Sequence, residues 1–124
     1  TLDGSMFDMA THALKKLASI LGEHGFHIHQ LVEINLFLSS MSSFAEINRA
    51  FLEAFRYSPP TRACVQVLLD AKTPFLINAI ACSEISFLLH VQSISTWAPA
   101  NIGPYSQIVQ VLIFLVCCFL YFYY

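Results

Sequence analysis

The apolar residues of this chain change their spacing between the helical and the strand period, and this alternation limits the fold more than any other feature of the sequence. Over residues 7–21 they recur every three or four positions, which places them on one face of a helix, and Gly22 and Gly25 are typical of a helix end. Over residues 29–39 apolar side chains recur at every second position, which predicts a strand with one buried face. A helix is therefore followed by a strand.

A second helix is predicted over residues 44–55. Ser43 and Glu46 have the spacing of a capping box, in which the serine hydroxyl accepts a hydrogen bond from the third amide and the glutamate returns one to the serine amide. The helix must end before Pro59, because the residue before a proline avoids the helical conformation. The inward stripe of this helix is expected to consist of Phe44, Ile47, Phe51 and Phe55.

Three further apolar runs, residues 62–69, 75–81 and 85–91, read as strands, and residues 70–74 read as the turn between the first two. The order of elements predicts an α+β fold in which two helices pack on one face of a mixed sheet. The other face of that sheet then requires a partner chain, another domain or solvent.

Residues 108–124 form an apolar tail with one polar amide side chain and no charge. Its 17 residues are the lower limit for a helix that crosses a bilayer. Three alternatives remain at this point: a membrane anchor, a buried strand favoured by the β-branched and aromatic content, and a chain end produced by a shifted coding boundary such as intron read-through. We expect the third.

Charge and cysteine content exclude some classes of function. Six Lys and Arg against eight Asp and Glu give a formal net charge of −2, so the chain has no basic field for nucleic acid. Four cysteines at irregular spacing do not make a disulfide framework and indicate a reducing, cytoplasmic location. They are Cys64, Cys82, Cys117 and Cys118.

Three of the five histidines lie close together in the sequence and raise the question of zinc. His24, His27 and His29 fall across a predicted helix end and turn, without a second ligand pair at the spacing of a zinc finger. A metal site also needs converging ligands and groups that orient them. We therefore predict no metal site.

Two stretches resemble the RidA/YjgF family of small α+β proteins, whose fold is chorismate-mutase-like. FAEINRAFLEAF followed by SPPTRACVQVLL is similar to the helix of that family and its Pro-x-Arg strand, and APANIGPYSQ is similar to the family's opening segment. The motif of a module's end thus precedes the motif of a module's start, which two tandem modules explain. Residues 1–91 are then a partial module lacking its first strands, residues 92–107 the start of a truncated second module, and residues 108–124 the apolar tail.

Tandem modules of this kind resemble the C-terminal region of the eukaryotic diphthine–ammonia ligase family. In that family an N-terminal domain uses ATP to activate the diphthine carboxylate on elongation factor 2, and ammonia completes diphthamide. The four glycines of this chain are isolated and form no phosphate loop, so we expect no cofactor here and ATP only in the parent protein.

The resemblance implies a binding or assembly region without catalysis of its own. Its expected partner is a second RidA-like module or a homo-oligomer with a trimer-like interface, and elongation factor 2 is the substrate of the parent protein. One alternative is a RidA-type deaminase of enamines or imines. Another is a fragment anchored to a membrane through residues 108–124.

Arg62 is the first candidate for a ligand-binding residue. A guanidinium at the start of a half-buried strand can hold a carboxylate by two parallel hydrogen bonds, although it can equally pair with a structural carboxylate. The resemblance implies that Arg62 and Tyr105 line the family's cleft, with Asn48 and Cys64 as weaker neighbours. Tyr105 belongs to the second module and meets Arg62 only across a module interface. A lone cysteine such as Cys64 is more often a small buried hydrophobe than a nucleophile.

One residue departs from the pattern of the deaminating members of the family. These carry a glutamate that is thought to orient the attacking water, and its best match here is Leu76. A leucine neither takes up nor donates a proton. We therefore predict no catalytic residue in this chain.

Overall fold

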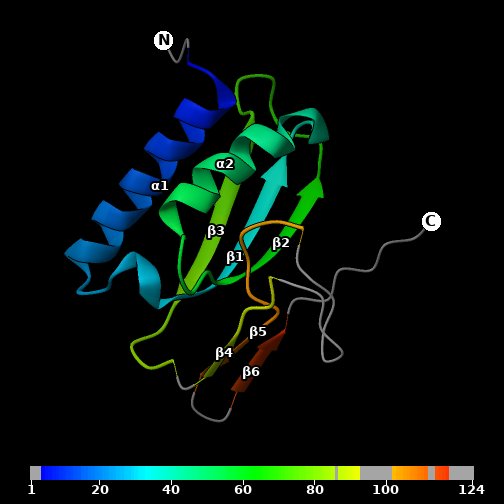
Figure 1. Ribbon diagram of the computed structural model, residues 1–124. Coiled ribbons are helices and arrows are strands. Elements are labelled where there is room, and N and C mark those ends of the chain that lie inside the picture. Colours follow the sequence, from blue (N-terminus) through cyan, green and yellow to red (C-terminus); the bar gives the residue numbers. More distant parts are fainter. Residues whose placement is uncertain (1–3, 86, 93–101, 112–113, 118–124) are drawn as a thin grey trace.

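A computed structural model of the chain describes residues 4–85, 87–92, 102–111 and 114–117. Two helices and three strands form its larger part, and three strands near the C-terminal end form the smaller part (Figure 1). The helices are α1 (Met6–Glu23) and α2 (Phe44–Ala54). The short 3₁₀ turn η1 (Ile28–Gln30) follows α1, and the 3₁₀ turn η2 (Met41–Ser43) precedes α2. The strands are β1 (Leu31–Leu38), β2 (Thr61–Gln66), β3 (Phe75–Ala81), β4 (Phe87–Leu89), β5 (Ile108–Val111) and β6 (Phe114–Cys117).

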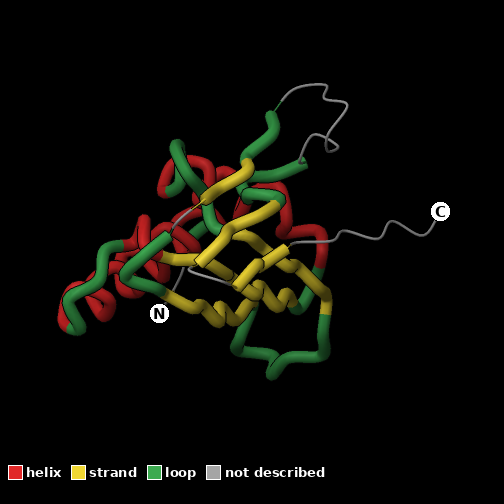
Figure 2. The backbone as a smooth tube through the Cα atoms, turned by 90° about the horizontal axis from the view of Figure 1, so that it is seen from below, coloured by secondary structure: helices red, strands yellow, loops and turns green. Residues whose placement is uncertain are grey.

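The larger sheet is mixed, as the sequence predicts. Its strand order is β2-β1-β3, with β2 parallel and β3 antiparallel to the central strand. Both helices lie on one side of this sheet (Figures 1 and 2). The predicted α+β architecture is confirmed.

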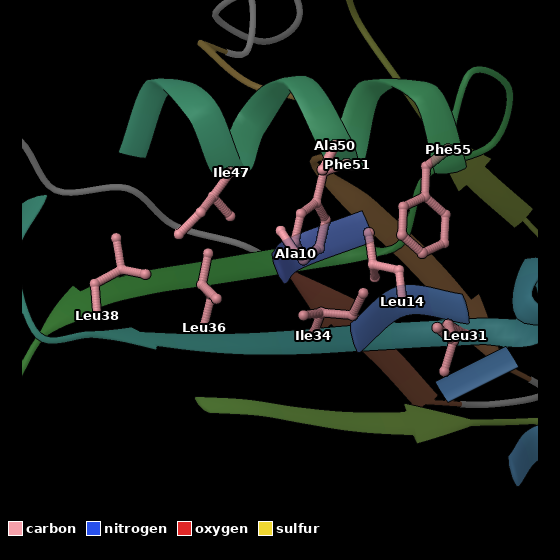
Figure 3. Close-up of a cluster of buried hydrophobic side chains, with 10 residues drawn as sticks. All are labelled: Ala10, Leu14, Leu31, Ile34, Leu36, Leu38, Ile47, Ala50, Phe51 and Phe55. Carbon is pink, nitrogen blue, oxygen red and sulfur yellow. The ribbon is translucent and has the colours of Figure 1, made fainter. Parts of the chain in front are cut away.

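The hydrophobic core lies between these helices and the sheet (Figure 3). Ile34, Leu36 and Leu38 of β1 are fully buried beneath the stripe of α2, in which the ring centroids of Phe51 and Phe55 lie 5.9 Å apart with the rings tilted by 33°. The β1–β2 register pairs Ile34 with Arg62 and Leu36 with Cys64. Because paired residues of neighbouring strands share a face, Arg62 and Cys64 lie on the helix-covered face.

The end of α1 follows the prediction, and its start reveals a cap that the sequence reading missed. Gly25 adopts a φ of +78°, and the amides of Gly25 and Phe26 donate to the carbonyls of Gly22 and Leu21 at 3.1 and 2.9 Å. At the other end Ser5 and Asp8 form a reciprocal capping box.

The capping box predicted for Ser43 and Glu46 is wrong. Ser43 has φ −83° and ψ −5°, and its side chain makes no cap hydrogen bond. The cause is the 3₁₀ turn η2, which runs directly into α2 and keeps Ser43 in a helical conformation. The side chain of Ser40, at the start of that turn, accepts from the Ser42 amide instead.

Two predicted strands are shorter in the structure. β2 ends at Gln66, three residues before the predicted end, and β4 is confined to Phe87–Leu89. Residue 86, within the predicted strand 85–91, lies outside the described residues. Only the paired part of each apolar run is therefore strand.

The apolar tail is a hairpin where the structure describes it. β5 pairs antiparallel with β4 and with β6, giving the order β4-β5-β6. Among the described residues no helix is both long and apolar enough to span a bilayer. The buried-strand alternative fits β5, whose Val109 is fully buried. Residues 112–113 and 118–124, including Cys118, lie outside the described part, so the predicted coding-boundary origin stays a prediction.

Candidate functional site

Arg62 lies at the start of β2 with its side chain beneath α2. Only 3% of its surface is exposed, and its Nη2 donates a hydrogen bond of 2.7 Å to Oδ1 of Asn48. The strand start is fixed by Thr61, whose buried hydroxyl donates to the carbonyl of Val32 at 2.8 Å. Burying a charge is costly in free energy unless neighbouring polar groups and rings compensate it, so the residues around the guanidinium must supply that compensation.

Three aromatic rings surround the guanidinium. The distance from its Cζ atom to the ring centroid is 5.1 Å for Phe51, 5.6 Å for Tyr105 and 5.7 Å for Phe44. At these distances the ring faces attract the cation, and they keep water from it. Phe44 and Phe51 come from α2, so the predicted stripe of that helix serves the site as well as the core.

The segment of residues 103–107 brings Tyr105 to this position. A Cβ atom on Gly103 would lie 2.6 Å from Nη2 of Arg62, so a side chain at this position would displace the backbone or the guanidinium. The amide of Tyr105 donates to the carbonyl of Gly103 at 2.9 Å, which makes a tight turn against the guanidinium. We call residues 103–107 the 103–107 segment.

Hydrogen bonds hold the other end of the 103–107 segment. The amide of Ser106 donates to the carbonyl of Pro60 at 2.9 Å, and its buried hydroxyl donates to the carbonyl of Pro59. The Gln107 side chain accepts from the Val91 amide at 2.9 Å and donates to the Val91 carbonyl at 3.1 Å. The two sequence motifs therefore meet, residue by residue, in one buried cluster.

The structure thus unites Arg62, Asn48 and Tyr105 within one chain. Their assignment to two separate modules stays a prediction. Sequence reasoning missed the roles of Gly103 and Ser106 and of the rings of Phe44 and Phe51, although the Gly-Pro-Tyr-Ser-Gln run was a signal that contained the first two.

Cys64 follows Arg62 on the same face of β2. It is partly buried and packs against the hydrophobic core. Burial raises the pKa of its thiol, and the charge of Arg62 opposes that rise. The side chain therefore stays a protonated thiol near neutral pH, which is a poor nucleophile.

Leu76 lies on the opposite face of the sheet from Arg62. It pairs with Phe37 across β1 and β3, and half of its surface is exposed. A side chain at this position therefore points away from the guanidinium of its own chain. Val65 and Ile80 share this face and are 46% and 52% exposed.

The histidines near residues 24–29 have local contacts. Nδ1 of His24 lies 2.9 Å from the carbonyl of Ile20 at the end of α1, and the His27 amide donates to the Gln30 side chain at 2.8 Å. Within the described residues no group of three His, Cys, Asp or Glu side chains is placed to hold a metal ion.

An open groove of about 360 Å³ runs beside the site. Asn48, Arg49 and Leu52 of α2 form one wall, and Gly103 and Pro104 belong to the other. Asn48 is bonded to the guanidinium and the backbone of Gly103 passes close to it, so the groove lies next to the Arg62 site, although Arg62 itself does not line it.

The sequence is similar to a known family and to two larger curated proteins. The family model described as endoribonuclease L-PSP matches residues 1–83. The diphthine–ammonia ligase of Schizosaccharomyces pombe is 39% identical over 100 residues, which are 79% of this chain and 16% of that protein. The diphthine–ammonia ligase of Saccharomyces cerevisiae is 34% identical over 110 residues, 74% of this chain and 16% of that protein.

Solved structures agree on the fold. The crystal structure of yeast Mmf1 superposes with a TM-score of 0.63 at 29% identity, over 66% of each chain. The chain spans about one sixth of the length of the two curated ligases that it matches.

Proposed function

Because the chain belongs to the endoribonuclease L-PSP family, which is the RidA/YjgF family that its motifs resemble, we propose a role for it in a larger protein. In this proposal it is a carboxylate-binding and assembly module of a diphthine–ammonia ligase-type protein. In this proposal the module has no reaction of its own. ATP and the amidation of diphthine on elongation factor 2 belong to the rest of the parent protein, in the cytoplasm. Two ligases share most of this chain's length, which supports that parentage.

The buried guanidinium of Arg62 carries the proposal. Its planar fork presents parallel N–H donors, the geometry that a carboxylate accepts with both oxygens. Asn48 and three rings hold it in place before a ligand arrives, so little side-chain entropy is lost on binding. Because Gly103 lies against Nη2, a carboxylate that enters from the groove reaches the guanidinium as the 103–107 segment shifts.

The neighbours of Arg62 support binding more than catalysis. The Tyr105 hydroxyl accepts from the Ile102 amide at 3.3 Å, Cys64 is a protonated thiol, and Leu76 is apolar and on the other face. None of these three supplies a general base at neutral pH.

The open face of the larger sheet supports the assembly role. Val65, Leu76 and Ile80 expose large apolar side chains there, opposite the face that the helices cover. Exposed large apolar side chains on one sheet face are typical of an interaction surface. We propose that a second RidA-like module or a second copy of this chain covers it.

Isothermal titration calorimetry with pyruvate, and with uncharged pyruvamide as the control ligand, tests the binding role. We expect pyruvate to bind at least about tenfold more tightly, because charge-assisted hydrogen bonds contribute about 1.5–3 kcal/mol. Arg62→Met should remove that preference. Because this variant places an apolar chain in a polar pocket, Arg62→Lys, which keeps the charge and loses the fork, is measured beside it. Equal binding of the two ligands to the native chain would refute the role.

A deaminase is the second candidate, favoured by the apposition of Arg62 and Tyr105 at 5.6 Å. The test is incubation of the chain with an imine made from an amino acid and a keto acid. Our proposal predicts hydrolysis at the background rate. Hydrolysis above background that Arg62→Ala abolishes would establish the deaminase instead.

A further inference from the structure

A second cavity lies between α1 and α2, and it shares no lining residue with the groove beside Arg62. Its volume is about 290 Å³. Pockets that take small molecules begin at about 300 Å³, so the cavity has the size for one metabolite of few heavy atoms. It is partly open to solvent.

Small side chains create this space. Ala18 of α1 and Ala50 and Ala54 of α2 line the cavity where larger residues would close the contact between the helices. Leu14 and Ile28 complete an apolar wall. Walls with nothing packed against them lose dispersion contacts, which an apolar group of matching size would restore.

Two opposite charges stand at the cavity, one on each helix. Lys15 comes from α1 and Glu53 from α2, and both side chains are exposed. Neither forms an ion pair with another residue of the part that the structure describes. Their charges are therefore available to a ligand that carries both signs.

A hydroxyl in the same wall adds a polar group. Oγ1 of Thr11 is shielded from solvent and has no hydrogen-bond partner within the described residues. A buried hydroxyl without a partner is unfavourable, and rotation about χ1 lets it turn toward a bound polar group.

From this arrangement we propose that the cavity binds a small aliphatic zwitterion, a free α-amino acid with an apolar side chain. The carboxylate pairs with Lys15, the ammonium group with Glu53, and the side chain fills the space between the alanines. A simple carboxylate or a simple amine satisfies one charge and is repelled by the other. The site is separate from the carboxylate site at Arg62 and does not depend on it.

The test is an NMR titration of the isotope-labelled chain with L-leucine. We expect shifts confined to backbone amides of α1 and α2 around the cavity, with a Kd on the order of 1 mM, as suits few heavy atoms at a partly open site. 4-Methylpentanoate, which lacks the ammonium group, and 3-methylbutylamine, which lacks the carboxylate, should each bind more weakly.

Charge variants sharpen the test. Lys15→Gln and Glu53→Gln should each weaken leucine binding about fivefold, the effect of one partly exposed ion pair. Lys16→Gln and Glu46→Gln are the matched controls, since both residues are exposed on the same helices and do not line the cavity. Ala54→Leu should fill the cavity and abolish binding while the chain stays folded by circular dichroism.

Three results would overturn the proposal. They are an absence of leucine shifts in the two helices, an equal loss of affinity in the control variants, and shifts centred on Asn48 and Gly103. The last result would place the ligand at Arg62, and so would support the proposed function while it removes this second site.

Discussion

The two halves of the Arg62 site are held in different ways. Arg62 and Asn48 project from β2 and α2, which flank the hydrophobic core, whereas the 103–107 segment is held by hydrogen bonds to Pro59, Pro60 and Val91. The packing of many core side chains together contributes many kcal/mol to the free energy of unfolding, while each hydrogen bond contributes about 0.5–1.5 kcal/mol. The core therefore anchors the guanidinium, whereas the position of the 103–107 segment depends on its hydrogen bonds.

The largest effect is expected where the fixed half rests on the core. Phe51→Ala should lower the free energy of unfolding by about 3–5 kcal/mol, because it opens a cavity under α2 and removes the ring nearest the guanidinium. Urea denaturation measures it. Leu52→Ala, next along the helix and 54% exposed, is the control and should change stability by less than about 0.5 kcal/mol. Similar losses in both variants would contradict the packing described here.

An intermediate effect is expected where the two halves touch. In Gly103→Ala the new Cβ would lie 2.6 Å from Nη2, so the segment or the guanidinium must shift, at a cost of about 1–3 kcal/mol. We expect weaker pyruvate binding by calorimetry together with the lower stability. Gly22→Ala is the matched control, since a Cβ there meets nothing within 4 Å and alanine favours the helix. A harmless Gly103→Ala would mean that the close approach is not required.

A smaller and local effect is expected at the outer end of the 103–107 segment. Ser106→Ala removes the hydroxyl that donates to the Pro59 carbonyl. Hydrogen exchange should become about tenfold faster at the Ser106 and Gln107 amides, with no change at the amides of β1. Faster exchange throughout the larger sheet would show that the two halves open together, and the comparison would fail.

The smallest effect concerns the thiol beside Arg62. Because burial raises the pKa of Cys64, its alkylation by iodoacetamide should require a higher pH than in the urea-unfolded chain. The folded state holds this proton more tightly, so the contribution to stability is present at neutral pH and falls as pH rises through the range where the thiol ionises. Arg62→Met removes the charge that lowers the pKa and should slow alkylation further. Identical pH profiles for the folded and unfolded chains would contradict the burial of this group.

Local patterns predicted the fold because each element carries its own period. The buried stripe of α2 and the buried face of β1 could be predicted from the spacing of their apolar residues, since both pack on one core. The lack of a capping box at Ser43 could not be predicted, because the 3₁₀ turn before α2 depends on contacts such as the Met41 amide donating to the Gln66 side chain at 2.9 Å. That contact joins residues 25 positions apart.

The site could be predicted in part for the same reason. Arg62, Asn48 and Tyr105 were indicated by motifs, and the structure brings them together. The close approach of Gly103 to the guanidinium joins residues far apart in the sequence, which no periodicity encodes. The cavity between α1 and α2 arises from alanines that look like ordinary helix residues in the sequence.

The most direct measurement follows the side-chain N–H signals of Arg62 by NMR while pyruvate is added. If the fixed guanidinium is the carboxylate site, these signals should shift downfield in step with binding, and the Gly103 and Tyr105 amides should change with them. Pyruvamide should leave all of them in place. Pyruvate binding that shifts other signals and leaves those of Arg62 unchanged would contradict the account.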